Sequence, residues 1–222
     1  MNTVKSWTDL PLGARAALDE QWAGLAAGGL PCGSAIVDAR GVVAVGRNRA
    51  YDAAGAIHTR MQHPLQHTRL AHAELNALAH VPTETDHASL TLWSTQHPCA
   101  MCAAAIAFVG IGRVRYVADD PSDASSPADN IASRKGIDYQ PLGDPLWWTI
   151  SNLLFLYNSA AQDGAEARNL RINRDRYRSL VRLTLELAQD DALGAAARLG
   201  TSLPNALAPY QVSLLRVSGE GL

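Results

Sequence analysis

The sequence predicts an α/β fold of layered helices and strands, followed by a helical extension. Two observations lead to this prediction. Between residues 33 and 142, runs rich in β-branched residues alternate with segments of helical periodicity, which is typical of layered α/β domains. From Pro145 onward the pattern is helical throughout. Of the 222 residues, 47% are hydrophobic and 18% are charged, a composition typical of soluble globular proteins.

The first predicted elements are a helix and a hairpin. Apolar residues at helical spacing predict a helix over Leu12–Ala27, and Gly28-Gly29 is a typical stop signal. The next segment, "GSAIVDARGVVAVGRN", contains two β-rich runs on either side of Asp38-Ala39-Arg40-Gly41. Two such runs around a short turn sequence predict a β-hairpin.

The central part of the chain continues the alternation. Residues 50–69 are polar and contain His58, His63 and His67, which indicates a long loop. Helices are predicted over residues 70–80 and, beginning at Pro98, to about Val109. "SLTLWST" and "RVRYVADD" are predicted strands, and "IDYQPL" is a further short one after a loop that begins at Asp119.

Charge and targeting signals exclude some classes of protein. The formal net charge is -2, so bulk charge does not favour binding to nucleic acid or to a membrane surface. The sequence has no run of 18 apolar residues and no apolar signal core near residue 1, so we expect no membrane span and a cytoplasmic location. Three cysteines, an odd and low number, argue against a disulfide framework.

Two short motifs contain residue types that commonly bind a catalytic metal ion. His72-Ala73-Glu74 begins one predicted helix, and Pro98-Cys99-Ala100-Met101-Cys102 begins another. Cysteines three residues apart share one helix face, and a helix N-terminus favours the thiolate. His72, Cys99 and Cys102 are therefore predicted zinc ligands, and three protein ligands leave a fourth position for water. Glu74 is the predicted proton shuttle beside that water. This combination is the signature of zinc deaminases.

Two other interpretations of the cysteine pair remain open at this point. A C-x-x-C pair can be redox-active, although a redox pair does not require His-x-Glu upstream. A structural zinc site would need a fourth protein ligand, such as Cys32 or another histidine. Otherwise Cys32 is expected to be a small buried residue.

At these motifs the chain resembles the cytidine deaminase superfamily, in its CMP/dCMP-type branch of nucleobase (guanine-type) and tRNA-adenosine deaminases. The resemblance runs from about Asp9 to Asp120 and includes Gly46-Arg47-Asn48-Arg49, the helix that begins at His72, "PCAMC", and Ile111-Gly112-Arg113-Val114. It implies a three-layer α/β/α sandwich around a mixed five-stranded sheet, one catalytic zinc ion and a homodimer. We expect a deaminase domain over residues 9–143 and a C-terminal helical extension over 144–222.

The resemblance also suggests substrate contacts at Asn48, Ala73 and His97. The family's asparagine hydrogen-bonds the bound substrate, and Asn48 occupies its position. The family commonly has glutamate where this chain has His97, so His97 is expected either to line the pocket or to pack at the strand end. The loop before His72 is longer than usual for the family. Its histidines are expected to be exposed to solvent, with contact to the substrate as the alternative.

The tail contains an apolar helix and a basic stretch. Trp147 and Trp148 are expected to pack on the core or on a partner subunit, because aromatic side chains bury large areas. Arg174, Arg178 and Arg182 recur every fourth residue and predict one basic helix face. A solvated face compensated by nearby acidic residues is the favoured interpretation, and a phosphate or RNA contact is the alternative.

The sequence as a whole predicts zinc-dependent hydrolytic deamination of an amino-purine or a related nucleobase or nucleoside, with release of ammonia. A tRNA adenosine deaminase and a cytosine- or cytidine-type pyrimidine deaminase are the alternatives within this chemistry. A catalytically silent, zinc-stabilised binding protein is the alternative from another class. Glu74 argues against that last possibility, because a structural site needs no carboxylate beside the metal.

Overall fold

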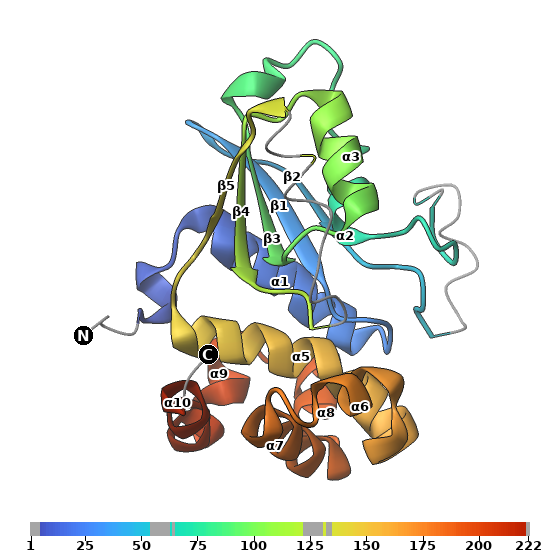
Figure 1. Cartoon of the computed structure of the whole chain (residues 1–222), viewed down its shortest axis with the longest axis vertical. Helices are drawn as coiled ribbons and strands as arrows, with labels where there is room; N and C mark the ends of the chain where they lie inside the picture. Colours follow the sequence, from blue (N-terminus) through green and yellow to red (C-terminus); the bar gives the residue numbers. More distant parts are fainter. Residues whose placement is uncertain (1–4, 54–62, 64, 122–130, 132–134, 221–222) are drawn as a thin grey trace.

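A five-stranded mixed sheet with helices on both faces forms the body of the molecule (Figure 1). The computed structural model describes residues 5–53, 63, 65–121, 131 and 135–220. The strand order is β2-β1-β3-β4-β5. The strands are β1 (Gly33–Asp38), β2 (Gly41–Arg47), β3 (Thr91–Gln96), β4 (Arg113–Ala118) and β5 (Asp138–Pro141). The predicted three-layer α/β/α sandwich is confirmed.

Strand directions divide the sheet into two parts. The predicted hairpin is confirmed, since β1 pairs antiparallel with β2 and the two-residue connection Ala39-Arg40 joins Asp38 to Gly41. β1 is also antiparallel to β3, whereas β3, β4 and β5 are mutually parallel. The carboxyl ends of β3 and β4 therefore lie at the same end of the sheet, toward α5 (Figure 1).

Alternate residues along the strands supply two separate cores. Ala35 and Trp93 face helix α1 (Leu12–Ala26) and the C-terminal helices. Their neighbours Ile36 and Leu92 face α2 (Ala73–Leu78) and α3 (Ala100–Val109). A strand turns successive side chains to opposite faces, so one apolar strand can serve both layers.

The third layer includes a helix from beyond the region of family resemblance. Helix α5 (Pro145–Asp163) packs beside α1 and contributes most of its length to the same core. Asp144 caps it, because its carboxylate accepts from the backbone N–H groups of Leu146 (3.0 Å) and Trp147 (3.2 Å), and Pro145 suits the first turn. The expected packing of the two tryptophans on the core is confirmed, and the ring of Trp147 lies 5.6 Å from that of Trp7.

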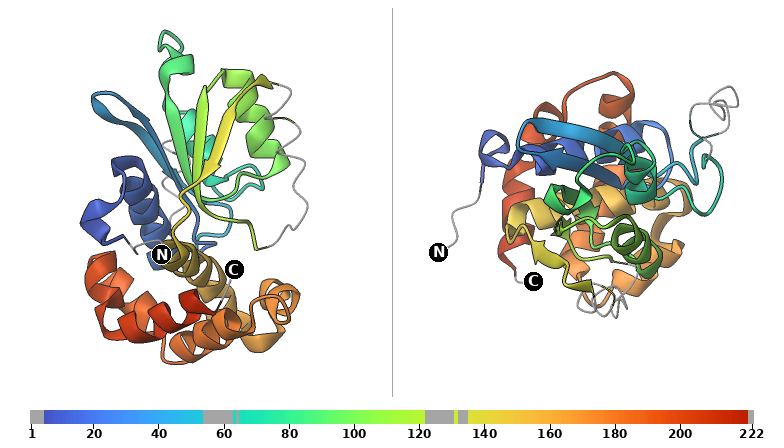
Figure 2. Two further views of the ribbon diagram at one scale, coloured as in Figure 1. Left: turned by 60° about the vertical axis from the view of Figure 1, so that its left-hand side comes forward. Right: turned by 90° about the horizontal axis from the view of Figure 1, so that it is seen from above.

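The C-terminal helices that follow α5 lie on the side of α5 that faces away from the sheet (Figure 2). Tyr157 of α5 joins two of them: its hydroxyl donates to the Leu187 carbonyl (2.8 Å) and accepts from the Leu193 N–H (3.1 Å). These helices are α6 (Arg168–Asn173), α7 (Arg178–Gln189), α8 (Ala192–Arg198), α9 (Leu203–Leu207) and α10 (Gln211–Gly219). Among the described residues, no helix is both long and apolar enough to cross a bilayer.

Two sequence predictions were wrong in detail. The helix predicted over residues 70–80 is shorter, because the backbone before Ala73 is extended at His72 and the helix ends at Leu78. The basic face was expected on one helix, but Arg174 lies after the end of α6 and before α7 begins at Arg178. A turn at residues 174–176 interrupts the helical periodicity there.

Candidate metal and catalytic site

Helix α2 places His72 and Glu74 at the carboxyl-end side of the sheet. His72 is the N-cap residue and Glu74 is the second residue of the helix. Gly46 of β2 lets this helix lie close to the sheet: a Cβ atom there would lie 2.4 Å from the Ala77 nitrogen and 2.5 Å from the Ala73 oxygen. The glycine of the Gly46-Arg47-Asn48-Arg49 segment is thus required for the position of the helix that bears His72.

Helix α3 supplies the two thiols directly after β3. Cys99 is its N-cap residue, and Cys102 lies one turn later with its side chain fully buried. The helix ends at Gly110, which has the left-handed backbone (φ 89°) that favours glycine at this position. A short connection from β3 therefore fixes both sulfur atoms relative to the sheet.

The three predicted ligands meet. Cys99 Sγ lies 3.6 Å from His72 Nδ1 and 3.6 Å from Cys102 Sγ, and Cys102 Sγ lies 3.5 Å from His72 Nδ1. Zinc bonds of about 2.3 Å to sulfur and about 2.0 Å to nitrogen require tetrahedral edges of about 3.5–3.8 Å between ligand atoms. The side chains present therefore fit a zinc ion, with one imidazole and two thiolates as its protein ligands.

The same contacts shift the pKa values of the metal-free ligands. The hydrogen bond from the Cys102 thiol, followed by that from His72, lowers the pKa of Cys99 to about 4 against the opposing effect of burial. The hydrogen bond with Cys99 raises the pKa of His72. Cys102, the donor to Cys99 in a buried position, has a raised pKa. Binding of zinc would release the Cys102 proton, since metal ligands must be deprotonated.

Glu74 is buried beside the ligands and is held in place by a serine. Its Oε2 lies 3.3 Å from Cys102 Sγ, and its Oε1 accepts a hydrogen bond of 3.0 Å from Ser94 Oγ. Only 6% of Glu74 is exposed, and this burial raises the pKa of its carboxyl group. A carboxyl group with a raised pKa gives up and regains a proton more readily near neutral pH.

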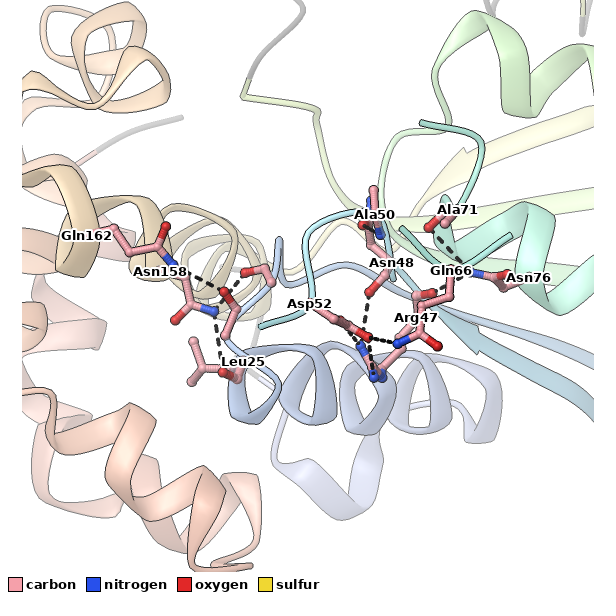
Figure 3. A network of polar contacts seen from close by, with 12 residues as sticks. Leu25, Arg47, Asn48, Ala50, Asp52, Gln66, Ala71, Asn76, Asn158 and Gln162 are labelled. Carbon is pink, nitrogen blue, oxygen red and sulfur yellow. Dashed lines mark hydrogen bonds and ion pairs between the residues drawn. The ribbon is translucent and has the colours of Figure 1, made fainter. Parts of the chain in front are cut away.

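Asn48 lies in a loop that is held by several hydrogen bonds and an ion pair (Figure 3). Its side-chain oxygen accepts from the Ala50 N–H (2.9 Å), which leaves the amide N–H₂ group for the cavity it lines. Arg47 and Asp52 form a bidentate pair at 2.6 and 2.9 Å, and Gln66 Nε2 donates to the same carboxylate (3.2 Å). Asn76 of α2 donates to the Arg47 carbonyl (2.8 Å), so the loop and the zinc helix are bonded to each other.

The other predicted substrate contacts, Ala73 and His97, also border the cavity. Ala73 is the first residue of α2. His97 lines the cavity and also packs at the strand end, with its ring 4.6 Å from that of Tyr116 and 5.7 Å from that of Tyr139. Both expected environments of His97 are thus present together.

The cavity has a volume of about 720 Å³, and sequence reasoning missed one of its walls. Ser94 and Gln96 of β3 line it, and the position of these polar residues directly before the Pro98–Cys102 motif could have revealed them. The opposite wall comes from α5 and α6, for which no local motif gave a signal. Its residues are Phe155, Asn158, Ser159, Gln162, Asp163, Ala167, Arg168 and Asn169.

Two side-chain amides of this wall donate hydrogen bonds to the backbone at the edge of the cavity (Figure 3). Asn158 Nδ2 donates to the carbonyls of Gly29 (2.7 Å) and Leu25 (3.3 Å), and Gln162 Nε2 donates to that of Gly28 (3.2 Å). Gly28 and Gly29 line the cavity, so α5 fixes part of its border.

Other residues singled out in the sequence lie outside the metal group. Cys32 is partly exposed and lines the cavity, and burial raises the pKa of its thiol well above the usual range. His58 lies outside the described residues. The rings of His63 and His80 are 6.5 Å apart, and neither His63 nor His67 lines the cavity.

The three arginines of the tail line a separate shallow groove on α7. Arg174 lies 3.7 Å from Glu166, and Arg182 lies 3.8 Å from Glu186. These exposed pairs fit the favoured interpretation of a solvated, compensated surface.

The chain shares its fold with a solved structure and is similar to others. A mutant of NE0047 in complex with 8-azaguanine is 20% identical with a TM-score of 0.50, over 66% of this chain and 81% of that chain. Guanine deaminase from Nitrosomonas europaea is 19% identical with a TM-score of 0.49, over 64% and 80%. RibD from Acinetobacter baumannii is 19% identical with a TM-score of 0.46, over 65% of this chain but only 38% of its own length.

A family model matches the part of the chain that contains the metal ligands. No curated protein matches the chain. The family model described as "Cytidine and deoxycytidylate deaminase zinc-binding region" matches residues 11–118, which contain His72, Glu74, Cys99 and Cys102. This stretch of the chain therefore belongs to the zinc-binding deaminase family, with zinc as its cofactor.

Proposed function

We propose that this protein is a hydrolytic deaminase of an amino-purine or a related nucleobase or nucleoside. The observation that carries the proposal is the position of Glu74, buried within 3.3 Å of a zinc ligand and facing the cavity. A structural zinc site has no use for a carboxylate there, whereas hydrolysis requires a proton carrier.

The residues of the chain have separate roles in this reaction. His72, Cys99 and Cys102 would hold zinc, which lowers the pKa of water to about 7. Glu74 takes a proton from the water that attacks the amino-bearing ring carbon. It delivers this proton to the ring nitrogen. It then takes the proton of the newly added hydroxyl group and passes it to the amino group, so that a carbonyl forms, the C–N bond breaks and ammonia leaves. Asn48 donates its amide N–H to a ring acceptor and so orients the ring, which contributes to the rate by fixing the attack geometry.

Ammonia release from a panel of substrates tests the proposal. The panel contains adenine, guanine and cytosine, their nucleosides, and a tRNA, each incubated with the zinc-loaded protein. Ammonia from a purine base or nucleoside supports the proposal. Turnover of the tRNA alone, or of the pyrimidines alone, would replace it with another deaminase activity. A zinc-loaded protein that is silent on every member would be a binding protein instead.

Glu74→Ala is the matching variant. It should retain one zinc ion per chain, because the three ligands are intact, and lose turnover by at least about 10²-fold, the usual contribution of a general acid–base group. Zinc content by mass spectrometry and ammonia release separate the two effects. Normal deamination by this variant would remove Glu74 from the mechanism.

A homodimer belongs to the same proposal. The resemblance implies it, and α3 exposes Phe108 to 92% together with Ala104 on the same face. We propose this exposed face of α3 as the surface that contacts the second chain. Light scattering of the wild-type protein and of Phe108→Ser tests it: a dimer that becomes a monomer supports this interface, and a wild-type monomer rules it out.

A further inference from the structure

The wall formed by α5 and α6 lies outside the stretch that matches the zinc-binding family model, yet it lines the same cavity as His72 and Cys99. One side of the cavity consists of residues of that stretch, including Asn48, His72, Glu74 and Cys99. The other side consists of helices that follow residue 144. The reacting end of a substrate must lie against the first side, so its remote end lies against the second.

The cavity is large enough to hold more than a bare ring. Its volume, about 720 Å³, lies in the upper part of the range of about 300–1,000 Å³ that is typical of sites for drug-sized ligands. An amino-heterocycle held against Glu74 and Asn48 is smaller than such a ligand. The α5–α6 side of the cavity is therefore available to a substituent on the ring.

Side chains on this wall fall into two groups. Asn158 and Gln162 are engaged with the Gly28–Gly29 rim. In contrast, the side chains of Ser159, Asp163, Arg168 and Asn169 have no hydrogen-bond or ion-pair partner within the described part of the chain, although all four line the cavity. They offer a hydroxyl, a carboxylate, a guanidinium group and an amide to a ligand at that end.

The charges of the lining decide what kind of substituent fits. Glu74, Asp120 and Asp163 are acidic, and Arg168 is the one lysine or arginine among the lining residues that the structure describes. Phosphate groups bind best to clusters of arginine or lysine and are repelled by carboxylates. Carboxylates and amides instead suit neutral hydroxyl groups, as an acidic side chain does when it binds ribose hydroxyls in dinucleotide sites.

We infer that Asp163 and Asn169 determine specificity for a hydroxylated, uncharged substituent, so that the preferred substrate is a nucleoside rather than a free base or a nucleotide. This inference rests on the proposed function and adds the substrate class. Asp163 accepts hydrogen bonds from sugar hydroxyls, and Asn169 binds a second oxygen of the same sugar.

Binding can be measured apart from turnover in the zinc-loaded Glu74→Gln variant. Isothermal titration calorimetry compares base, nucleoside and 5′-monophosphate for the guanine, adenine and cytosine rings. For the ring that binds, the nucleoside should bind about tenfold more tightly than the base, as expected for a gained hydrogen bond to a charged group, and more tightly than the monophosphate. A base or monophosphate that binds as tightly as the nucleoside overturns the inference, and so does the absence of nucleoside binding.

Substitutions on the α5–α6 wall, made in the Glu74→Gln variant, test whether that wall is responsible for the tighter binding of the nucleoside. Asp163→Asn and Asn169→Ala should each weaken nucleoside binding by about three- to tenfold and leave base binding unchanged. Asp175→Asn, in the exposed turn between α6 and α7, is the matched control and should change neither. Equal losses for base and nucleoside would show that the wall does not contact the sugar. The wild-type protein separates failure of this inference from failure of the proposed function. If the proposed function is wrong, the wild-type protein binds the nucleoside but releases no ammonia.

Discussion

Ser94 on β3 and Glu74 on α2 are joined by a hydrogen bond of 3.0 Å inside the molecule, 20 residues apart in the sequence. The serine hydroxyl donates to the carboxylate oxygen Oε1, while Oε2 faces Cys102. A buried carboxylate that is bonded on one side has a defined orientation. Both the sheet, through Ser94, and helix α2 therefore fix the position of the Glu74 carboxylate.

Replacement of Ser94 should impair catalysis without loss of zinc. Ser94→Ala removes the donor that orients Glu74, and we expect kcat to fall about tenfold, the order of one lost hydrogen bond to a charged group. Zinc content should stay unchanged, because Ser94 is not a ligand. Ser34→Ala is the matched control: Ser34 is paired with Ser94 in the sheet, but its hydroxyl bonds the Trp93 carbonyl (2.8 Å). If both variants lose the same activity, Ser94 has no special role in orienting Glu74.

The metal-free protein should show one reactive thiol. With a pKa of about 4, Cys99 is a thiolate at about pH 6, whereas the raised pKa values of Cys102 and Cys32 keep those thiols protonated. After removal of zinc by a chelator, iodoacetamide at that pH should label Cys99 first, as measured by mass spectrometry of peptides. Lowering the pH through about 4 should slow the labelling, and restored zinc should prevent it. Equal labelling of Cys99 and Cys32 would contradict these assignments.

The Arg47–Asp52 pair should stabilise the loop that presents Asn48. Their side chains are 12% and 4% exposed, so Asp52→Ala leaves a buried guanidinium without its partner. Such a loss costs roughly 3–5 kcal/mol. We expect a lower free energy of unfolding in urea and a higher KM. Asp138→Ala breaks a more exposed pair with Arg115, at 44% and 20%, and should cost less than about 1 kcal/mol. Similar costs for the two variants would show that burial of the Arg47 pair is unimportant.

Gly46 should tolerate no larger residue. In Gly46→Val the Cβ atom alone would lie within 2.5 Å of two backbone atoms of α2, and backbone atoms move only if the helix is displaced. We expect a lower melting temperature and weaker zinc retention in competition with a chelator, because His72 moves with the helix. Gly219→Ala, where a Cβ atom meets nothing within 4 Å, is the control. Normal zinc retention by Gly46→Val would mean that α2 does not depend on this close approach.

Sequence spacing predicted the metal group correctly but misplaced one arginine of the tail. The spacing of His72, Glu74, Cys99 and Cys102 predicted the metal group, and the structure brings the three ligands together. The same kind of periodicity placed Arg174, Arg178 and Arg182 on one helix, and it was wrong because it does not detect the turn after Asn173. Helical spacing is informative only where the backbone stays helical.

The chemical identity of the site follows from local sequence alone: one imidazole, two thiols and a carboxylate, each placed at a helix start by signals of a few residues. The surroundings of these groups follow from tertiary packing. Packing of the layers determines which side chains are buried next to one another. It thereby places the Ser94 hydroxyl, the Arg47–Asp52 pair and the wall of α5 and α6 around the site. Gln96 and Asn152, bonded at 2.7 Å across 56 residues, are one such contact. Local propensity cannot encode contacts of that kind, because they form only when the distant segments have been packed against the same core.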